Sequence, residues 1–251
     1  MRIRRDPVTV IGDETHGEPL AERAGKAWGV GGSESQETDP DGRTDQTGSR
    51  GRARAIARHT SHLILGGARS GKSRHALGLA KAAGLRPAFV ATAQGLDDDM
   101  RARIARHRAE RPAGWLTIEE PLALVAACRD LPDAAELALI DCLTLWVGNR
   151  ILRGDGEAAI AADAAALGEL IAEARRTWLI VSNEVGTGVH PETAEGMRFR
   201  DALGLVNQAI AAAADRVTLM VAGVPVRVKD VTATDRAPQA AIGGTHARRA
   251  P

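Results

Sequence analysis

Eight consecutive residues carry the clearest chemistry in this sequence. They are Gly66, Gly67, Ala68, Arg69, Ser70, Gly71, Lys72 and Ser73, and an apolar run at 63–65 precedes them. A glycine-rich turn between a strand and a helix directs backbone N–H groups at phosphate oxygens, and the helix N-terminus favours the same anion. Lys72 supplies charge for the outer phosphates, and the Ser73 hydroxyl can ligate Mg²⁺. The motif therefore predicts that the chain binds a nucleoside triphosphate together with Mg²⁺.

Two further stretches carry groups suited to phosphate chemistry. Asp141 follows an apolar run, where a carboxylate holds Mg²⁺ in many phosphate-loop proteins. The stretch 97–111 surrounds a single histidine, His107, with five arginines. A helix this basic is most often a solvated face, and a lone histidine is most often structural. However, a neutral imidazole among phosphate-binding arginines is what a nucleophilic attack on phosphorus requires, so both interpretations stay open.

Apolar runs and helical segments alternate through the middle of the chain. We expect strands at 62–65, 87–92, 115–118, 136–141, 178–182 and 217–222, with an edge extension at 225–229. We expect helices at 72–83, 97–111, 157–176 and 199–214, with Asp97 as an N-cap. Apolar strands between helices predict an α/β fold of the P-loop NTPase, RecA-like type: a mostly parallel sheet with helices on both faces. Ligands of such sheets bind beyond the carboxyl ends of the strands, where the phosphate loop, Thr92 and Asp141 fall.

Composition limits the domain organisation and the choice of partner. We predict one domain over residues 61–229, between a disordered extension (1–60) and a disordered tail (230–251) that are poor in large apolar side chains. A net charge of +1, with four Trp, two Phe and no Tyr, argues against nucleic-acid binding. The two cysteines form no C-x-x-C pair, which favours a reduced, cytoplasmic protein. No apolar run is long enough to span a membrane.

Beyond the phosphate loop, further motifs recur in order and at the spacing of one known family. They are 91–93 with 97–100, the run Arg103-Ile104-Ala105-Arg106-His107-Arg108-Ala109-Glu110-Arg111-Pro112, the stretch 141–144, and Ser182-Asn183-Glu184-Val185-Gly186. Across residues 61–229 the chain resembles the adenosylcobinamide kinase/adenosylcobinamide-phosphate guanylyltransferase family of cobalamin biosynthesis. The phosphate loop alone is generic, whereas the arginine- and histidine-bearing run and the Asn-Glu-Val-Gly loop are specific to this family.

The resemblance implies a bifunctional enzyme and assigns residues to it. Such an enzyme phosphorylates the aminopropanol hydroxyl of adenosylcobinamide with ATP or GTP, and then transfers GMP from GTP to that phosphate, giving adenosylcobinamide-GDP and pyrophosphate. In the family a histidine carries the GMP; His107 occupies that position, beside Arg106 where members often have a second histidine. The implied catalytic pair is His107 and Lys72, with Mg²⁺ on Ser73 and Asp141, and members form homo-oligomers, here an expected trimer. The family's nucleotide contacts fall on 66–73 and on Ala91, Thr92, Ala93, Arg108, Ala109, Glu110, Arg111, Glu119 and Asp141.

The residues taken without the resemblance leave other functions open. The chain could be a plain P-loop kinase of a small metabolite, in which His107 forms no covalent intermediate. It could be a nucleotide-dependent switch that binds but transfers little. A RecA-like nucleic-acid motor is the third alternative, against which the near-neutral charge and the scarce aromatics weigh. Nucleotide turnover that depends on cobinamide separates the bifunctional enzyme from all three.

Overall fold

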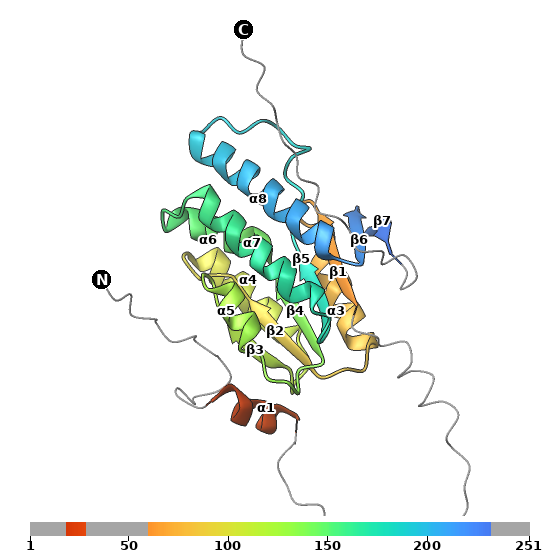
Figure 1. The fold of residues 1–251 in the computed structure, drawn as a ribbon. Coiled ribbons are helices and arrows are strands. Elements are labelled where there is room, and N and C mark those ends of the chain that lie inside the picture. Colours follow the sequence, from red (N-terminus) through yellow and green to blue (C-terminus); the bar gives the residue numbers. More distant parts are fainter. Residues whose placement is uncertain (1–18, 29–59, 232–251) are drawn as a thin grey trace, which may run out of the picture.

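The computed structural model describes residues 19–28 and 60–231, and its centre is a seven-stranded sheet (Figure 1). The strand order is β3-β2-β4-β5-β1-β6-β7, in which the first six strands are parallel and β7 pairs antiparallel with β6. The strand bounds are β1 (Ser61–Gly66), β2 (Pro87–Ala91), β3 (Leu116–Glu119), β4 (Leu137–Asp141), β5 (Thr177–Val181), β6 (Arg216–Val221) and β7 (Val224–Asp230). Each predicted strand is confirmed, with ends that differ by at most one residue.

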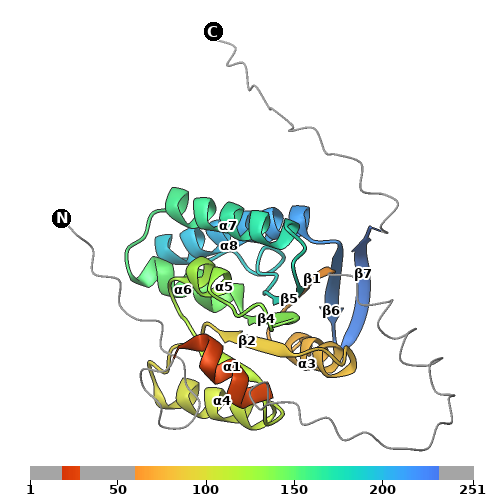
Figure 2. The ribbon, with the colours of Figure 1, turned by 60° about the horizontal axis from the view of Figure 1, so that its bottom comes forward.

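Helices cover both faces of the sheet, as the α/β prediction requires (Figure 2). On one face, side chains of α3 pack with Ile64, Leu139 and Leu179, and α4 lies on the same side. The opposite face is covered by α5 to α8, which enclose the larger part of the core. The bounds are α3 (Lys72–Ala82), α4 (Asp98–Ala109), α5 (Leu124–Arg129), α6 (Leu143–Leu152), α7 (Glu157–Ala172) and α8 (Ala194–Ala213). The chain therefore has the predicted α/β architecture of a P-loop NTPase.

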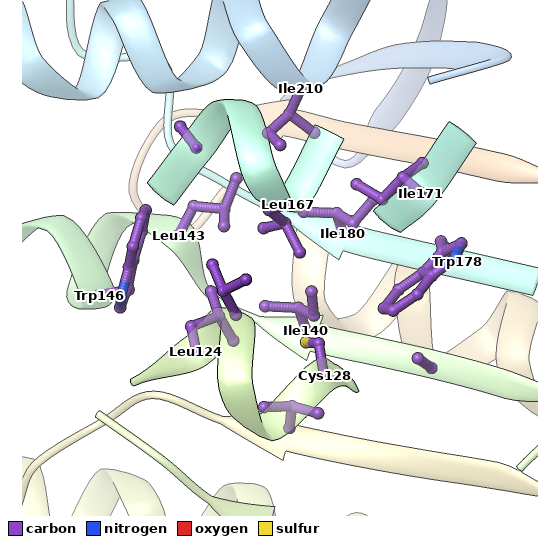
Figure 3. Close-up of a cluster of buried hydrophobic side chains, with 14 of the residues drawn as sticks. Leu124, Cys128, Ile140, Leu143, Trp146, Leu167, Ile171, Trp178, Ile180 and Ile210 are labelled. Atoms are coloured by element: carbon purple, nitrogen blue, oxygen red, sulfur yellow. The ribbon is translucent and has the colours of Figure 1, made fainter. Parts of the chain in front are cut away.

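The core beneath α5 to α8 explains why α6 escaped prediction. Figure 3 shows Trp146 and Leu143 of α6 beside Leu124 of α5 and Ile140 of β4. Helix α6 is rich in β-branched and aromatic residues, and no side chain caps its N-terminus, so the local signals for a helix are weak. Its apolar face becomes favourable only against the sheet, since tertiary packing supplies most helical stability in proteins.

Helix boundaries follow local capping where capping exists. The Asp97 side chain accepts a hydrogen bond from Met100 N at 2.6 Å, which confirms it as the N-cap of α4. Helix α8 begins at Ala194, five residues before the predicted start, because the Thr193 hydroxyl caps it by accepting from Gly196 N at 3.0 Å. In the described part of the chain, no helix has the length and apolar character needed to cross a membrane.

One helix lies inside the extension that was predicted to be disordered. Helix α1 (Leu20–Trp28) contacts the core with Leu20 and Trp28, and Ala24 is only 3% exposed. The Arg86 guanidinium lies 6.0 Å from the Trp28 ring centroid. The prediction is wrong for these residues because α1 gains its apolar burial from the domain and not from its own segment. The predicted tail, 230–251, also begins too early, because Asp230 is the last residue of β7 and Val231 N donates to Asp215 O at 2.9 Å. Residues 1–18, 29–59 and 232–251 lie outside the described part, so their disorder stays a prediction.

Candidate active site

The phosphate loop between β1 and α3 has the backbone that its sequence predicts. A Cβ on Gly66 would lie 2.4 Å from Ser70 Oγ and 2.8 Å from Met220 O, so only glycine fits there. Gly71, just before α3, has φ +91°, which favours glycine again. The Lys72 ammonium donates to Gly67 O at 3.1 Å and so bridges the loop. Burial lowers the pKa of Lys72, while the nearby Cys142 and Asp141 oppose this shift.

Asp141 connects the phosphate loop with α4. The Ser73 hydroxyl donates to Asp141 Oδ1 at 3.3 Å, and His107 Nδ1 lies 3.9 Å from Asp141 Oδ2. The second distance is within range of a charge contact but too long for a hydrogen bond. Burial raises the pKa of Asp141, and the His107 charge and the Ser73 hydrogen bond oppose that rise. The two oxygen donors, Ser73 Oγ and the Asp141 carboxylate, suit Mg²⁺, which is commonly held by one or two protein oxygens together with phosphates and water.

Helix α4 is fixed over the site by the arginine at its C-terminal end. Arg111 Nε donates to His107 O at 3.1 Å, and Arg111 Nη1 donates to Thr117 Oγ1 at 3.1 Å. Its guanidinium also lies 4.2 Å from the Phe89 ring centroid, within cation–π range. These contacts tie the His107 turn to β2 and β3. They explain how a helix with no buried residue can still present His107 in one place.

A pocket opens between α4 and the carboxyl ends of β2, β3 and β4. The empty space in this pocket is about 510 Å³, a volume that includes its part open to solvent. His107, Arg111, Glu119 and Asp141 line it, together with Ala91 and Ala93, so most of the predicted site residues beyond the phosphate loop meet here. Arg108 is not a lining residue, but it forms an ion pair with Glu119, which is one. Ala109 and Glu110 are exposed at the end of α4 and do not line the pocket.

Thr92 lies beside this pocket but faces the protein. Its hydroxyl donates to Cys142 O at 2.7 Å and accepts from Cys142 N at 2.8 Å, and the residue is fully buried. Its carbonyl accepts from the Asn149 amide at 2.7 Å. The side chain of Thr92 therefore holds the turn that follows Asp141. Its neighbours Ala91 and Ala93 line the pocket, and Thr92 does not.

Sequence reasoning assigned no individual role to several pocket residues. The pocket is also lined by Phe89, Met100, Arg103, Ile104, Cys142 and Leu145. Arg103 had a usable signal, because it precedes His107 by one helical turn and so shares its face. The apolar residues had none, since nothing distinguishes them locally from core residues. Burial raises the pKa of the Cys142 thiol to about 11, so this lining group stays neutral near pH 7.

The loop that follows β5 lies against the beginning of the phosphate loop. Glu184 N donates to Gly66 O at 3.2 Å, and the Glu184 carboxylate accepts from Gly186 N at 2.7 Å. Asn183 is hydrogen-bonded to two helices on the face of the sheet opposite α3. Its N–H donates to Thr144 Oγ1 of α6 at 2.7 Å, and its carbonyl accepts from the Asn207 amide of α8 at 2.9 Å. The loop is thus a fixed part of the edge that carries the phosphate loop.

Comparison with known proteins shows the family to which the chain belongs. The bifunctional adenosylcobalamin biosynthesis protein CobP of Pseudomonas aeruginosa is 48% identical over 167 residues, which cover 66% of this chain and 96% of that protein. The bifunctional adenosylcobalamin biosynthesis protein CobU of Escherichia coli is 39% identical, covering 66% of this chain and 98% of that protein. Among solved structures, an ATPase from the type III secretion system of pathogenic bacteria aligns with a TM-score of 0.45 at 11% identity, over 70% of this chain and 60% of that chain. Residues 62–228 match the model of cobinamide kinase / cobinamide phosphate guanyltransferase, and the chain belongs to this family.

Proposed function

We propose that this protein is a bifunctional adenosylcobinamide kinase and adenosylcobinamide-phosphate guanylyltransferase of cobalamin biosynthesis. The observation that carries the proposal is the line of contacts from Ser73 through Asp141 to His107, at 3.3 and 3.9 Å. These contacts place a candidate nucleophile, His107, close to the phosphate loop. Nucleotide binding by a phosphate loop does not itself require such a nucleophile. Membership of the family and the two bifunctional relatives support the same activity.

In the guanylyl transfer, His107 is the nucleophile. Its Nδ1 faces Asp141, so its Nε2 is the nitrogen available to a substrate. Nε2 attacks the α-phosphorus of GTP, the N–P bond forms, and the bond to the bridging oxygen breaks, which releases pyrophosphate. An oxygen of adenosylcobinamide phosphate then attacks the same phosphorus and returns the electron pair to His107. Two displacements of moderate difficulty replace one direct reaction between two anions.

The neighbouring groups stabilise charge that develops during this displacement. Lys72 and the N-terminus of α3 face the pyrophosphate leaving group, and Arg103 lines the pocket on the same helix as His107. Ser73 and Asp141 would hold Mg²⁺, which supplies Lewis acidity to the phosphate oxygens when it is bound. The second oxygen of Asp141 lies 3.9 Å from His107 Nδ1, so the same carboxylate would also stabilise the positive charge that the imidazole gains in the displacement.

The kinase reaction uses the same phosphate loop. ATP or GTP binds along residues 66–73, and the aminopropanol hydroxyl of adenosylcobinamide attacks the γ-phosphorus. We further propose that the enzyme is a cytoplasmic homo-oligomer, a trimer by family resemblance, with no nucleic-acid partner. The nucleotide contacts proposed above remain 66–73, Ala91–Ala93, Arg108–Arg111, Glu119 and Asp141, with the Thr92 hydroxyl acting through its bonds to Cys142.

The decisive experiment traps the covalent intermediate. The protein is incubated with Mg²⁺ and α-³²P-GTP without corrinoid, and run on denaturing gels after acid or alkali washes. Wild type should carry a label that is acid-labile and alkali-stable, as a phosphoramidate is, and His107→Ala should carry none. His190→Ala is the matched control, because His190 lies in an exposed loop, where its ring Nδ1 is 3.1 Å from Pro191 O.

The outcomes separate the alternatives. If GTP-binding wild type carries no label, His107 is not the nucleophile, and cobinamide-dependent turnover of ATP then identifies a plain kinase. Nucleotide that binds without such turnover identifies a switch. A label that persists in His107→Ala assigns the covalent step to another residue and refutes the role proposed for His107.

A further inference from the structure

We propose that Glu184 is the general base of the kinase step, which accepts the proton of the attacking hydroxyl. The inference rests on the proposed function, and it addresses how one phosphate loop serves two reactions with different acceptors. Four observations carry it: the place of Glu184 in the sheet, the orientation of its carboxylate, the absence of a competing partner, and its separation from His107.

Glu184 lies beside the beginning of the phosphate loop. Strand β5 is the direct neighbour of β1, with Val181 paired to Ile64, so the segment after β5 emerges at the same edge as Gly66. The backbone contact between Glu184 N and Gly66 O, at 3.2 Å, shows that the two segments touch. Asp141, by contrast, ends β4, which is separated from β1 by β5. Glu184 is therefore the acidic residue whose strand lies next to the phosphate-loop strand.

The carboxylate of Glu184 is oriented and its loop is anchored. Gly186 N donates to Glu184 Oε1 at 2.7 Å, which leaves the second oxygen for another donor. A Cβ on Gly186 would lie 3.1 Å from the same oxygen, so a larger residue there would displace the carboxylate slightly. Asn183 is hydrogen-bonded on both its N–H and its C=O, to α6 and α8 respectively. Such anchoring limits the reorganisation that a base needs when it accepts a proton.

The other carboxylates at this edge are already engaged. Asp141 accepts from Ser73 and faces His107, and Glu119 is paired with Arg108. Glu120 accepts from two backbone N–H groups, of Leu122 and Ala123, at the start of α5. Within residues 19–28 and 60–231, Glu184 makes no ion pair, and its carboxylate is bound only by the neutral Gly186 N–H. It is thus the carboxylate with capacity left for a hydroxyl proton.

The groups proposed to attack the nucleotide in the two reactions, His107 and the substrate hydroxyl beside Glu184, approach from different faces of the sheet. His107 lies on α4, on the same side as α3, and Lys81 of α3 donates to Glu110 O at the end of α4. The Glu184 loop is fastened to α6 and α8, which cover the opposite face (Figure 2). The pocket around His107 includes none of residues 182–188. The hydroxyl acceptor and the histidine thus reach one bound nucleotide without competing for space.

The step is balanced with the groups named. The aminopropanol hydroxyl oxygen of adenosylcobinamide forms a bond to the γ-phosphorus, and the bond from that phosphorus to the β–γ bridging oxygen breaks. The hydroxyl proton moves to Glu184, and the nucleoside diphosphate leaves with the bond electrons while Lys72 faces its charge. General-base assistance of this kind is worth roughly 10²- to 10⁴-fold in rate.

The test compares two reactions in one variant. Glu184→Gln keeps the oxygen that Gly186 N binds but cannot take a proton. We expect phosphate transfer from γ-³²P-ATP to adenosylcobinamide to fall about 10²-fold or more in kcat, with little change in the KM for ATP. Labelling of His107 by α-³²P-GTP should stay within about two-fold of wild type, which also shows that the variant is folded. Glu192→Gln, in the same loop and exposed, is the matched control and should keep both reactions.

Each contrary result has its own meaning. Kinase turnover of Glu184→Gln within about three-fold of wild type overturns the assignment. Loss of both reactions overturns it too, because Glu184 then supports the phosphate loop instead of acting as a base. Wild-type protein that lacks cobinamide-dependent turnover refutes the proposed function before any variant is made. A complementary loss in His107→Ala, of labelling but not of kinase turnover, completes the expected separation.

Discussion

Replacing Thr92 by valine tests how the structure holds Asp141 in place. The change removes a hydroxyl but keeps the branched shape, so packing is nearly preserved. Cys142 N then loses the acceptor at 2.8 Å that the structure gives it, and Cys142 O loses a donor at 2.7 Å. The carbonyl keeps a second donor, because Trp146 N also binds it at 3.2 Å. The Cys142 N–H is therefore left without a hydrogen-bond acceptor, whereas the Cys142 carbonyl loses one of its two hydrogen-bond donors.

The size of the effect follows from these two losses. A carbonyl that loses one of two hydrogen bonds costs about 1 kcal/mol, and a buried N–H left without a partner costs about 1–3 kcal/mol. We therefore expect Thr92→Val to lower the free energy of unfolding by roughly 2–4 kcal/mol. The turn after Asp141 also loses its restraint, so His107 labelling by GTP should slow.

Urea unfolding at neutral pH measures this change. The fluorescence of the buried Trp146 and Trp178 reports the transition, with circular dichroism as a second probe. Thr177→Val is the matched control, since Thr177 is buried in β5 and its hydroxyl makes no hydrogen bond within the described part of the chain. We expect no loss of stability there. If Thr92→Val costs less than about 0.5 kcal/mol, its hydroxyl does not hold the turn and the reasoning fails.

Three further predictions concern other parts of the molecule. Arg111→Ala removes two hydrogen bonds and the contact with Phe89, so we expect a loss of about 2 kcal/mol in urea unfolding; unchanged stability would mean that Arg111 acts only on ligand. Burial, with Arg216 and His75, lowers the pKa of His62 from 6.5 to about 4, so the unfolded chain takes up this proton first as the pH falls. The stability contributed by His62 is therefore fully present above pH 6.5 and declines toward pH 4. Between pH 7.5 and pH 5 the free energy of unfolding should fall by at most about 2 kcal/mol, because the ring is partly exposed. Urea unfolding of His62→Gln at both pH values should not show this decline. Ala24→Asp places an unpaired carboxylate against the core and should detach α1 at a cost of about 1–3 kcal/mol, with His107 labelling unchanged; a loss of labelling would connect α1 to the site.

Much of the site could be predicted from the sequence because its signals are local. The phosphate loop is a contiguous run whose glycines, lysine and serine each have a backbone or charge requirement, and the structure confirms the turn. The alternation of apolar runs and helices likewise determines the strands, since burial on both faces of a parallel sheet leaves each strand continuously apolar. Asp97 capped the helix that it was predicted to cap, because a cap depends on residues within one turn.

The remaining features depend on residues that meet only after folding. The sequence could not say that Thr92 faces Cys142, that Arg108 is drawn to Glu119, or that α6 forms at all. Helix α1 was not predicted for the same reason, because the apolar residues on which it packs are far from it in the sequence. The sequence also left His107 open between a solvated face and a nucleophile; the structure adds that α4 places it 3.9 Å from Asp141. By itself the sequence determined the phosphate loop, the sheet and the family likeness, whereas the tertiary structure alone decided which polar groups face each other across the site, since that choice is made by packing between segments far apart in the chain.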